Sequence, residues 1–121
     1  MKKLKKEIQK KGMKFFQVYE NETFYIYATI IEDWFNSYEI FSKKLNKPWK
    51  YCEEESERYP RDDDFGVWAW SCSNDTSLSK ILRQKYDTTT NEIEEIISQV
   101  GSETQKILNL VSGTDLKSLQ M

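Results

Sequence analysis

The stretch TFYIYATII, residues 23–31, carries the strongest strand signal of the chain. It consists almost entirely of β-branched and aromatic residues, which are enriched in strands. Successive side chains of a strand point to opposite faces of a sheet. One face would carry Phe24, Ile26, Ala28 and Ile30, and the other Tyr25, Tyr27, Thr29 and Ile31. Because both sets are largely apolar, we expect a central strand that is at least partly covered on both sides.

The neighbouring segments extend this strand into an antiparallel meander. Residues 14–19 (KFFQVY) predict the preceding strand, and residues 20–22 (ENE) predict the turn between the two, since asparagine tolerates positive φ. A third strand is expected at about 36–43. The alternative is a helix within 30–44, which the spacing of three aromatic residues also fits: Trp34, Tyr38 and Phe41. The aromatic content and the preceding hairpin favour the strand.

A further short strand is expected at residues 65–72 (FGVWAWSC). Its alternation would place Trp68, Trp70 and Cys72 on one face. The neighbouring residues are acidic, whereas aromatic platforms that stack bases carry interleaved basic residues. These aromatics are therefore interpreted as core, and an exposed tryptophan, Trp34 or Trp49, is the alternative anchor for a protein interface.

Helices are expected at both ends of the chain. Residues 2–11 predict a short helix, with Leu4 and Ile8 on one face and Gly12 as its C-cap. Two helices follow the sheet. Asp75 or Thr76 would cap the first, whose apolar stripe is Leu78, Ile81, Leu82 and Tyr86. The run of threonines at 88–90 would cap the second, whose heptad-like seam is Ile93, Ile97, Val100, Thr104, Ile107 and Val111.

Together these elements predict the α+β class: a small antiparallel sheet of three to four strands, with a short N-terminal helix and two C-terminal helices packed on it. The length of 121 residues fits a single domain, 1–121. Its parts are a basic N-terminal helix in 1–13, a sheet in 14–72 with a long charged loop at 44–64, two helices in 75–112, and a tail at 113–121. The seam within 91–111 either packs on its own sheet or forms a homodimer.

Charge is unevenly distributed, although the net charge is only −2. Residues 1–14 hold seven lysines and one glutamate, and residues 53–64 hold seven acids and two arginines. Clustered cations are needed for phosphate contacts, so nucleic-acid binding through Lys2 to Lys14 is one hypothesis. The acidic pI of about 5.3, the scarcity of arginine and the absence of a helix-turn-helix or zinc pattern disfavour it.

The chain has no histidine, which removes the usual general acid–base and the commonest metal ligand. Two cysteines without histidine cannot build a structural zinc site in one chain, and four scattered glycines form no phosphate loop. No cofactor is expected. Carboxylates remain, so a divalent-metal-dependent, nuclease-like enzyme centred on Asp62, Asp63 and Asp64 is a second hypothesis. No Glu-x-Lys triplet follows this cluster, as such nucleases would require.

We expect a cytoplasmic protein with reduced thiols at Cys52 and Cys72, because the lysine-rich start lacks an apolar segment and no run approaches the ~20 residues of a membrane span. The segments YEIF (38–41) and YPRDDDFGVWAW (59–70) resemble small uncharacterised proteins of bacterial mobile elements and phages, over about residues 36–72. The resemblance implies an accessory or host-interaction role and no specific activity.

The leading hypothesis is a non-enzymatic protein-binding module, which engages or inhibits a host protein such as a defence nuclease. A charged loop as long as 44–64 is unusual in a small domain and is often functional. Its acidic surface would be the contact and would mimic nucleic-acid phosphates. The interaction residues expected there are Trp49, Glu53, Glu54, Glu55, Glu57, Asp62, Asp63 and Asp64.

Overall fold

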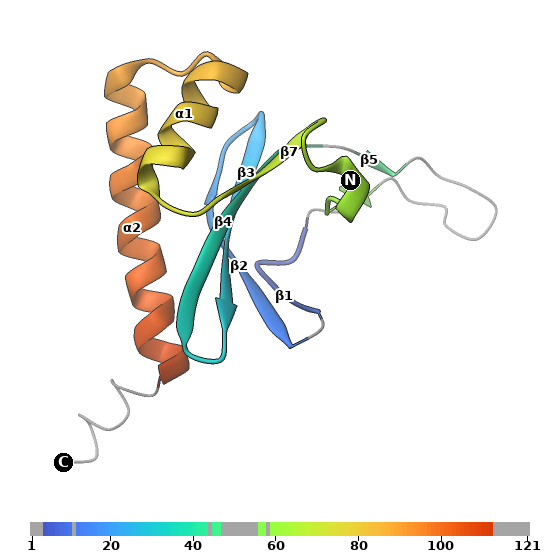
Figure 1. The fold of residues 1–121 in the computed structure, drawn as a ribbon, viewed down its shortest axis with the longest axis vertical. Coiled ribbons are helices and arrows are strands. Elements are labelled where there is room, and N and C mark those ends of the chain that lie inside the picture. The colour runs from blue at the N-terminus through green and yellow to red at the C-terminus, as the bar shows by residue number, and fades with distance from the viewer. Residues whose placement is uncertain (1–3, 11, 44, 47–55, 58, 113–121) are drawn as a thin grey trace.

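A computed structural model describes residues 4–10, 12–43, 45–46, 56–57 and 59–112. The fold is α+β, with an antiparallel five-stranded sheet in the order β1-β2-β3-β4-β7 and two helices (Figure 1). The strands are β1 (Glu7–Lys10), β2 (Met13–Glu20), β3 (Phe24–Ile31), β4 (Trp34–Ser42) and β7 (Ala69–Cys72). The helices are α1 (Asp75–Tyr86) and α2 (Thr90–Ser112).

The predicted N-terminal helix in 2–11 is wrong, because residues 7–10 form the edge strand β1. Ile8 pairs with Phe15, and Gly12 adopts φ +79° in the hairpin turn between the two strands. Both Leu4 and Ile8 pack against the aromatic residues of the sheet. A spacing of four residues fits a helix turn, but it also keeps two side chains on the same face of a strand. Five strands therefore form the sheet, where three to four were expected.

The central strand is confirmed as β3, which is covered on both faces. On the helix side, Phe24, Ile26 and Ala28 join one core cluster with residues of α1 and α2, whose most buried members are Leu78, Leu82 and Val100. On the opposite side, Tyr25 and Tyr27 join a second cluster with Phe15, Phe41 and Trp68. Burial of a large apolar side chain stabilises the fold by roughly 1.5–3 kcal/mol, so the aromatics compensate for a polar composition.

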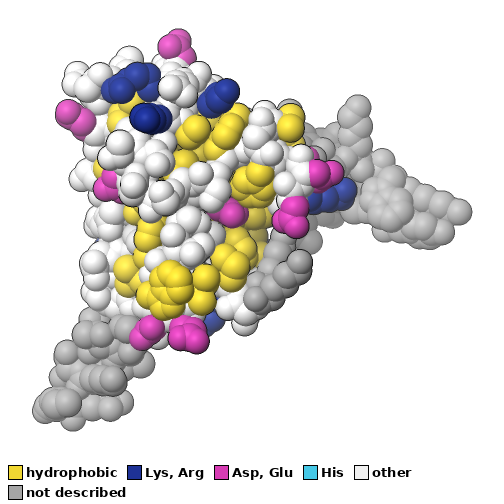
Figure 2. All heavy atoms as spheres, in the orientation of Figure 1, with side chains coloured by type: hydrophobic (Ala, Val, Ile, Leu, Met, Phe, Trp, Pro, Cys, Tyr) yellow, Lys and Arg dark blue, Asp and Glu magenta, His cyan; other side chains and the backbone are white. Residues whose placement is uncertain are grey.

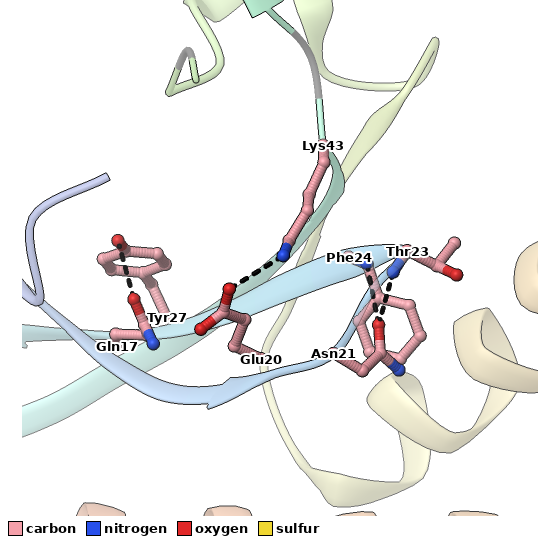
Figure 3. Close-up of polar contacts among 7 residues, drawn as sticks. All are labelled: Gln17, Glu20, Asn21, Thr23, Phe24, Tyr27 and Lys43. Atoms are coloured by element: carbon pink, nitrogen blue, oxygen red, sulfur yellow. Dashed lines mark hydrogen bonds and ion pairs between the residues drawn. The ribbon is translucent and has the colours of Figure 1, made fainter. Parts of the chain in front are cut away.

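The strand reading of 36–43 is confirmed, and the helix alternative within 30–44 is wrong. The turn between β2 and β3 forms at the predicted place, by a different means. Asn21 accepts hydrogen bonds at its Oδ1 from the backbone N–H of Thr23 and of Phe24, at 2.8 and 2.9 Å (Figure 3). Positive φ among non-glycine residues occurs instead at Glu32 and Asp87 in the described part of the chain.

The alternation expected for residues 65–72 holds only from Ala69 onward. Trp70 and Cys72 face the helices, whereas Trp68 belongs to the cluster on the opposite side. The reason is a tight turn before β7, in which Gly66 has φ +90° and the Asp64 carbonyl accepts from the backbone N–H of Val67 and Trp68. The chain at Trp68 has therefore not yet entered the strand.

Both C-terminal helices lie on one face of the sheet (Figure 1). Asn74, rather than Asp75 or Thr76, caps α1, by accepting from the Ser77 N–H at 2.8 Å. Thr89 caps α2 through its hydroxyl, which accepts from Glu92 N–H at 3.3 Å. The seam of α2 packs on the chain's own sheet, and Ile96, which heptad spacing omits, is also buried in it. Neither helix is long and apolar enough to cross a membrane.

Candidate functional site

The predicted 44–64 loop returns to the sheet through an anchored segment. Two short strands within it pair with each other, β5 (Leu45–Asn46) and β6 (Ser56–Glu57). Pro60 is buried, and the Tyr59 ring makes edge contacts with Phe15, Tyr27 and Phe41 at centroid distances of 5.5, 5.2 and 4.8 Å. This part of the loop is therefore packed as a cover for the second face of the sheet.

The phenol of Tyr59 donates a hydrogen bond to the Glu39 carboxylate on β4. Burial raises the pKa of Tyr59 well above its ordinary range, and the negative charge of Glu39 and the hydrogen bond to it act in the same direction. The phenol consequently stays protonated at neutral pH and serves as a donor. It is not poised as a nucleophile or a base.

A pocket of about 220 Å³ opens beside this pair. Phe15, Tyr59 and Phe65 provide aromatic walls, and Glu39 and Asp62 provide carboxylates; Met13 and Pro60 complete the lining. Apolar pockets with a few convergent polar groups are the usual form of binding sites, although this one lies below the roughly 300–1,000 Å³ typical of drug-sized ligands. Its size suits one protruding side chain.

The acidic cluster expected at 62–64 forms a single turn of 3-10 helix, η1 (Asp62–Asp64), at the rim of this pocket. Asp64 has a structural role, since its Oδ2 accepts from the Arg61 backbone N–H at 2.9 Å. Asp62 and Asp63 are exposed, and within the described residues their side chains make no hydrogen bond or ion pair. Val67, three residues after η1, is 72% exposed. The η1 surface, defined as Asp62, Asp63 and Val67, thus combines two unpaired charges with an apolar side chain.

The described residues give no evidence that the other predicted interaction residues lie at this surface. Trp49, Glu53, Glu54 and Glu55 lie outside the described residues, and Glu57 is the second residue of β6. Glu39, Tyr59 and Phe65 were missed, because none carries a local sequence signal for a pocket. The pocket forms only when the loop folds back on β2 and β4.

The described part of the chain shows no site for either alternative hypothesis, a divalent-metal-dependent enzyme or nucleic-acid binding through the N-terminal lysines. No group of three cysteine, aspartate or glutamate side chains there is placed to hold a metal ion. Lys5 and Lys6 are exposed next to the edge strand β1, where cationic side chains also discourage pairing with other strands. Cys72 is a free, buried thiol, and burial raises its pKa to about 11, so it behaves as a core residue.

A second apolar surface lies at the far end of the sheet. Figure 2 shows hydrophobic side chains gathered over the lower end of β4, bordered by acidic ones. Trp34 at the start of β4 is 49% exposed, and Leu110 near the end of α2 is 67% exposed. The expectation of an exposed tryptophan therefore holds for Trp34.

Searches with this chain find no matching family model, no similar curated protein and no similar solved structure. The resemblance to proteins of mobile elements and phages stays a prediction, and the site must be interpreted from its own chemistry.

Proposed function

We propose that the chain is a non-enzymatic module that binds another protein through an acidic surface. The observation that carries the proposal is the η1 surface, where Asp62 and Asp63 stand unpaired within the described residues beside an apolar pocket. An exposed apolar group next to unpaired carboxylates suits a partner with a basic surface, because complementary potentials steer association and fix its register.

The buried reactive groups fit a binding role better than a catalytic one. A thiol with a pKa of about 11 is largely protonated at neutral pH, and the Tyr59 phenol is held protonated as well. The partner we expect is a nucleic-acid-binding host protein such as a defence nuclease. Carboxylates on the η1 surface would occupy positions that phosphates take in its natural ligand.

The test is a pull-down from bacterial lysate with three tagged proteins. These are the natural chain, the double variant Asp62→Asn/Asp63→Asn, and the control Asp33→Asn/Glu94→Gln, which removes two exposed charges elsewhere. We expect one salt-sensitive partner that the natural chain and the control retain and the η1 variant loses. Equal retention by all three, or no protein above background with the natural chain, would refute the proposal.

A further inference from the structure

A second pocket, of about 260 Å³, lies on the helix side of the sheet, where the β2–β3 turn meets the connection between α1 and α2 (Figure 1). Its lining shares no residue with the pocket beside η1. Phe24 and Ile96 of this lining belong to the helix-side cluster, whereas Phe15 and Tyr59 belong to the cluster on the other face, so the two pockets open on opposite sides of the sheet. What the second pocket binds does not depend on the function proposed for the η1 surface.

Aromatic rings form one wall of this pocket. Phe24 is 3% exposed at the centre, with the Tyr19 ring at 5.9 Å and the Tyr86 ring at 4.6 Å between centroids. Asn21 fixes this wall by accepting two backbone N–H groups of the turn (Figure 3). Tyr86 is held by a 2.8 Å hydrogen bond between its hydroxyl and that of Ser42.

Aromatic faces attract organic cations, and this chain already uses that interaction elsewhere. The Lys43 ammonium lies 4.9 Å from the centroid of Tyr25, and the Lys85 ammonium lies 5.6 Å from that of Trp70. No lysine or arginine lines the second pocket among the described residues. A cation at its aromatic wall would therefore have to come from a ligand.

Two carboxylates face the same space from α2. Glu92 and Glu95 are one turn apart, both are exposed, and neither forms a hydrogen bond through its side chain or an ion pair in the described part of the chain. Glu92 lies in the first turn of α2, where the helix dipole favours an acid. Glu95 lies beyond that turn, so the dipole gives no reason for it.

The Thr88 hydroxyl is a further acceptor at this pocket. Thr88 lines the pocket and is 9% exposed, and its hydroxyl makes no hydrogen bond within the described residues. No buried side-chain oxygen or nitrogen there lacks a partner, so this hydroxyl is accessible from the pocket and can meet a ligand or solvent. A hydroxyl oxygen can accept from an N–H donor of the same cation that the carboxylates attract.

We propose that this pocket binds the guanidinium head group of an organic cation, as in an arginine side chain or a small alkylguanidine. A guanidinium is planar, stacks on aromatic rings and presents a fork of donors that matches carboxylates. Glu95 and Glu92 supply the acceptors, Thr88 accepts a further N–H, and the half-buried Tyr19 and Tyr86 rings, which pack on Phe24, take the flat face. The volume suits a head group and is below the roughly 300 Å³ at which drug-sized sites begin.

The test is a titration of the ¹⁵N-labelled chain followed by amide NMR spectra at fixed ionic strength. The probes are N-acetyl-arginine methylamide and its citrulline counterpart, which has the same shape without the charge. We expect saturable shifts at Phe24, Thr88 and Ile96 with the arginine compound, and at least tenfold weaker binding of citrulline. Absence of saturation at millimolar probe, or equal binding of the two compounds, would refute the site.

Matched variants separate the pocket from general electrostatics. Glu95→Gln should weaken arginine binding at least fivefold, whereas Glu94→Gln, its exposed neighbour outside this pocket, should change it less than twofold. Equal losses in both would mean nonspecific attraction and overturn the assignment. A lysine analogue that binds more tightly than the arginine compound would overturn the choice of guanidinium.

A second set of probes in the same titration distinguishes a protein side chain from a small molecule as the source of the cation. A glycine-flanked arginine peptide that binds more tightly than the capped amino acid supports a protein side chain. Stronger binding of a free alkylguanidine supports a small molecule. The same amide spectra establish that each variant is folded, so a loss of binding is not confused with a loss of structure.

Discussion

Replacing Tyr59 with phenylalanine removes one hydroxyl and keeps the ring that packs on Phe15, Tyr27 and Phe41. The hydroxyl donates to Glu39, and hydrogen bonds to charged groups contribute about 1.5–3 kcal/mol. We therefore expect the free energy of unfolding of Tyr59→Phe to be lower by about 2 kcal/mol at pH 8. The pH dependence of this difference is the sharper part of the prediction.

In the folded chain the pKa of Tyr59 is raised well above its ordinary value, by burial first and then by Glu39. The unfolded chain therefore releases this proton at a pH near 10, where the folded chain still holds it. Stability contributed by this group is fully present below that pH and is lost as pH rises above it. The loss amounts to about 1.4 kcal/mol per pH unit for each tyrosine kept protonated.

Phenylalanine has no hydroxyl proton to release, so the unfolding free energy of Tyr59→Phe does not fall with pH through this group. The difference between the two proteins should fall from about 2 kcal/mol at pH 8 to near zero at about pH 11.5. Burial also raises the pKa of Tyr38 and of Tyr86. Those groups steepen the alkaline decline of both proteins equally and cancel in the difference.

The assay is urea denaturation of both proteins at half-unit steps from pH 8 to 11.5, followed by far-ultraviolet circular dichroism. A difference that stays constant across this range would refute the reasoning, because it would mean that Tyr59 ionises equally easily in the folded and unfolded chain. A difference near zero at pH 8 would instead refute the contribution of the Glu39 hydrogen bond.

Three further predictions concern stability and are checked by the same denaturation assay at pH 7. Gly101→Ala should stabilise the chain by about 0.5–1 kcal/mol, because this exposed position is inside α2 and a Cβ there meets nothing within 4 Å; destabilisation would contradict it. Leu82→Ala should cost about 2–5 kcal/mol because Leu82 is fully buried, whereas the exposed Leu110→Ala should stay within about 0.5 kcal/mol; similar losses would contradict the core assignment. Asp64→Ala should cost about 1 kcal/mol through the lost bond to the Arg61 N–H, and Asp63→Ala should cost less than half of that; the reverse order would show that the roles within η1 are misassigned.

The central strand could be predicted from the sequence because a strand buried on both faces consists almost entirely of β-branched and aromatic residues. Residues 23–31 could hardly pack in any other way, and the amphipathic stripes of the two C-terminal helices were equally plain. Short segments were ambiguous for a physical reason. Leu4 and Ile8 satisfy both the helix and the strand period, and only the hairpin at Gly12, pairing β1 with β2, decides between them.

Only part of the candidate site could be predicted from the sequence. A run of acids marked residues 62–64, but sequence alone could not separate Asp64, which closes η1, from Asp62 and Asp63, which point to solvent. Almost nothing in the sequence predicts the second pocket. Its aromatic wall comes from β2, β3 and α1, and its carboxylates come from α2, where Glu92 in the first turn already has an ordinary explanation in the dipole and Glu95 has no local signal.

The location of both pockets follows from how the aromatic sheet is covered. Helices α1 and α2 cover one face of the sheet, and the Tyr59–Trp68 segment covers the other. The two pockets lie at the edges of these covering elements, where ligands can reach the protein. The η1 surface is where the returning loop turns into β7, and the second pocket is where the helices turn above the β2–β3 hairpin. Both carry unpaired carboxylates within the described residues, so the same charge preference recurs on opposite sides of the sheet. A single basic partner that reaches both sides would therefore lose affinity in the Asp62→Asn/Asp63→Asn variant and in Glu95→Gln, and two independent ligands would each respond to one variant alone.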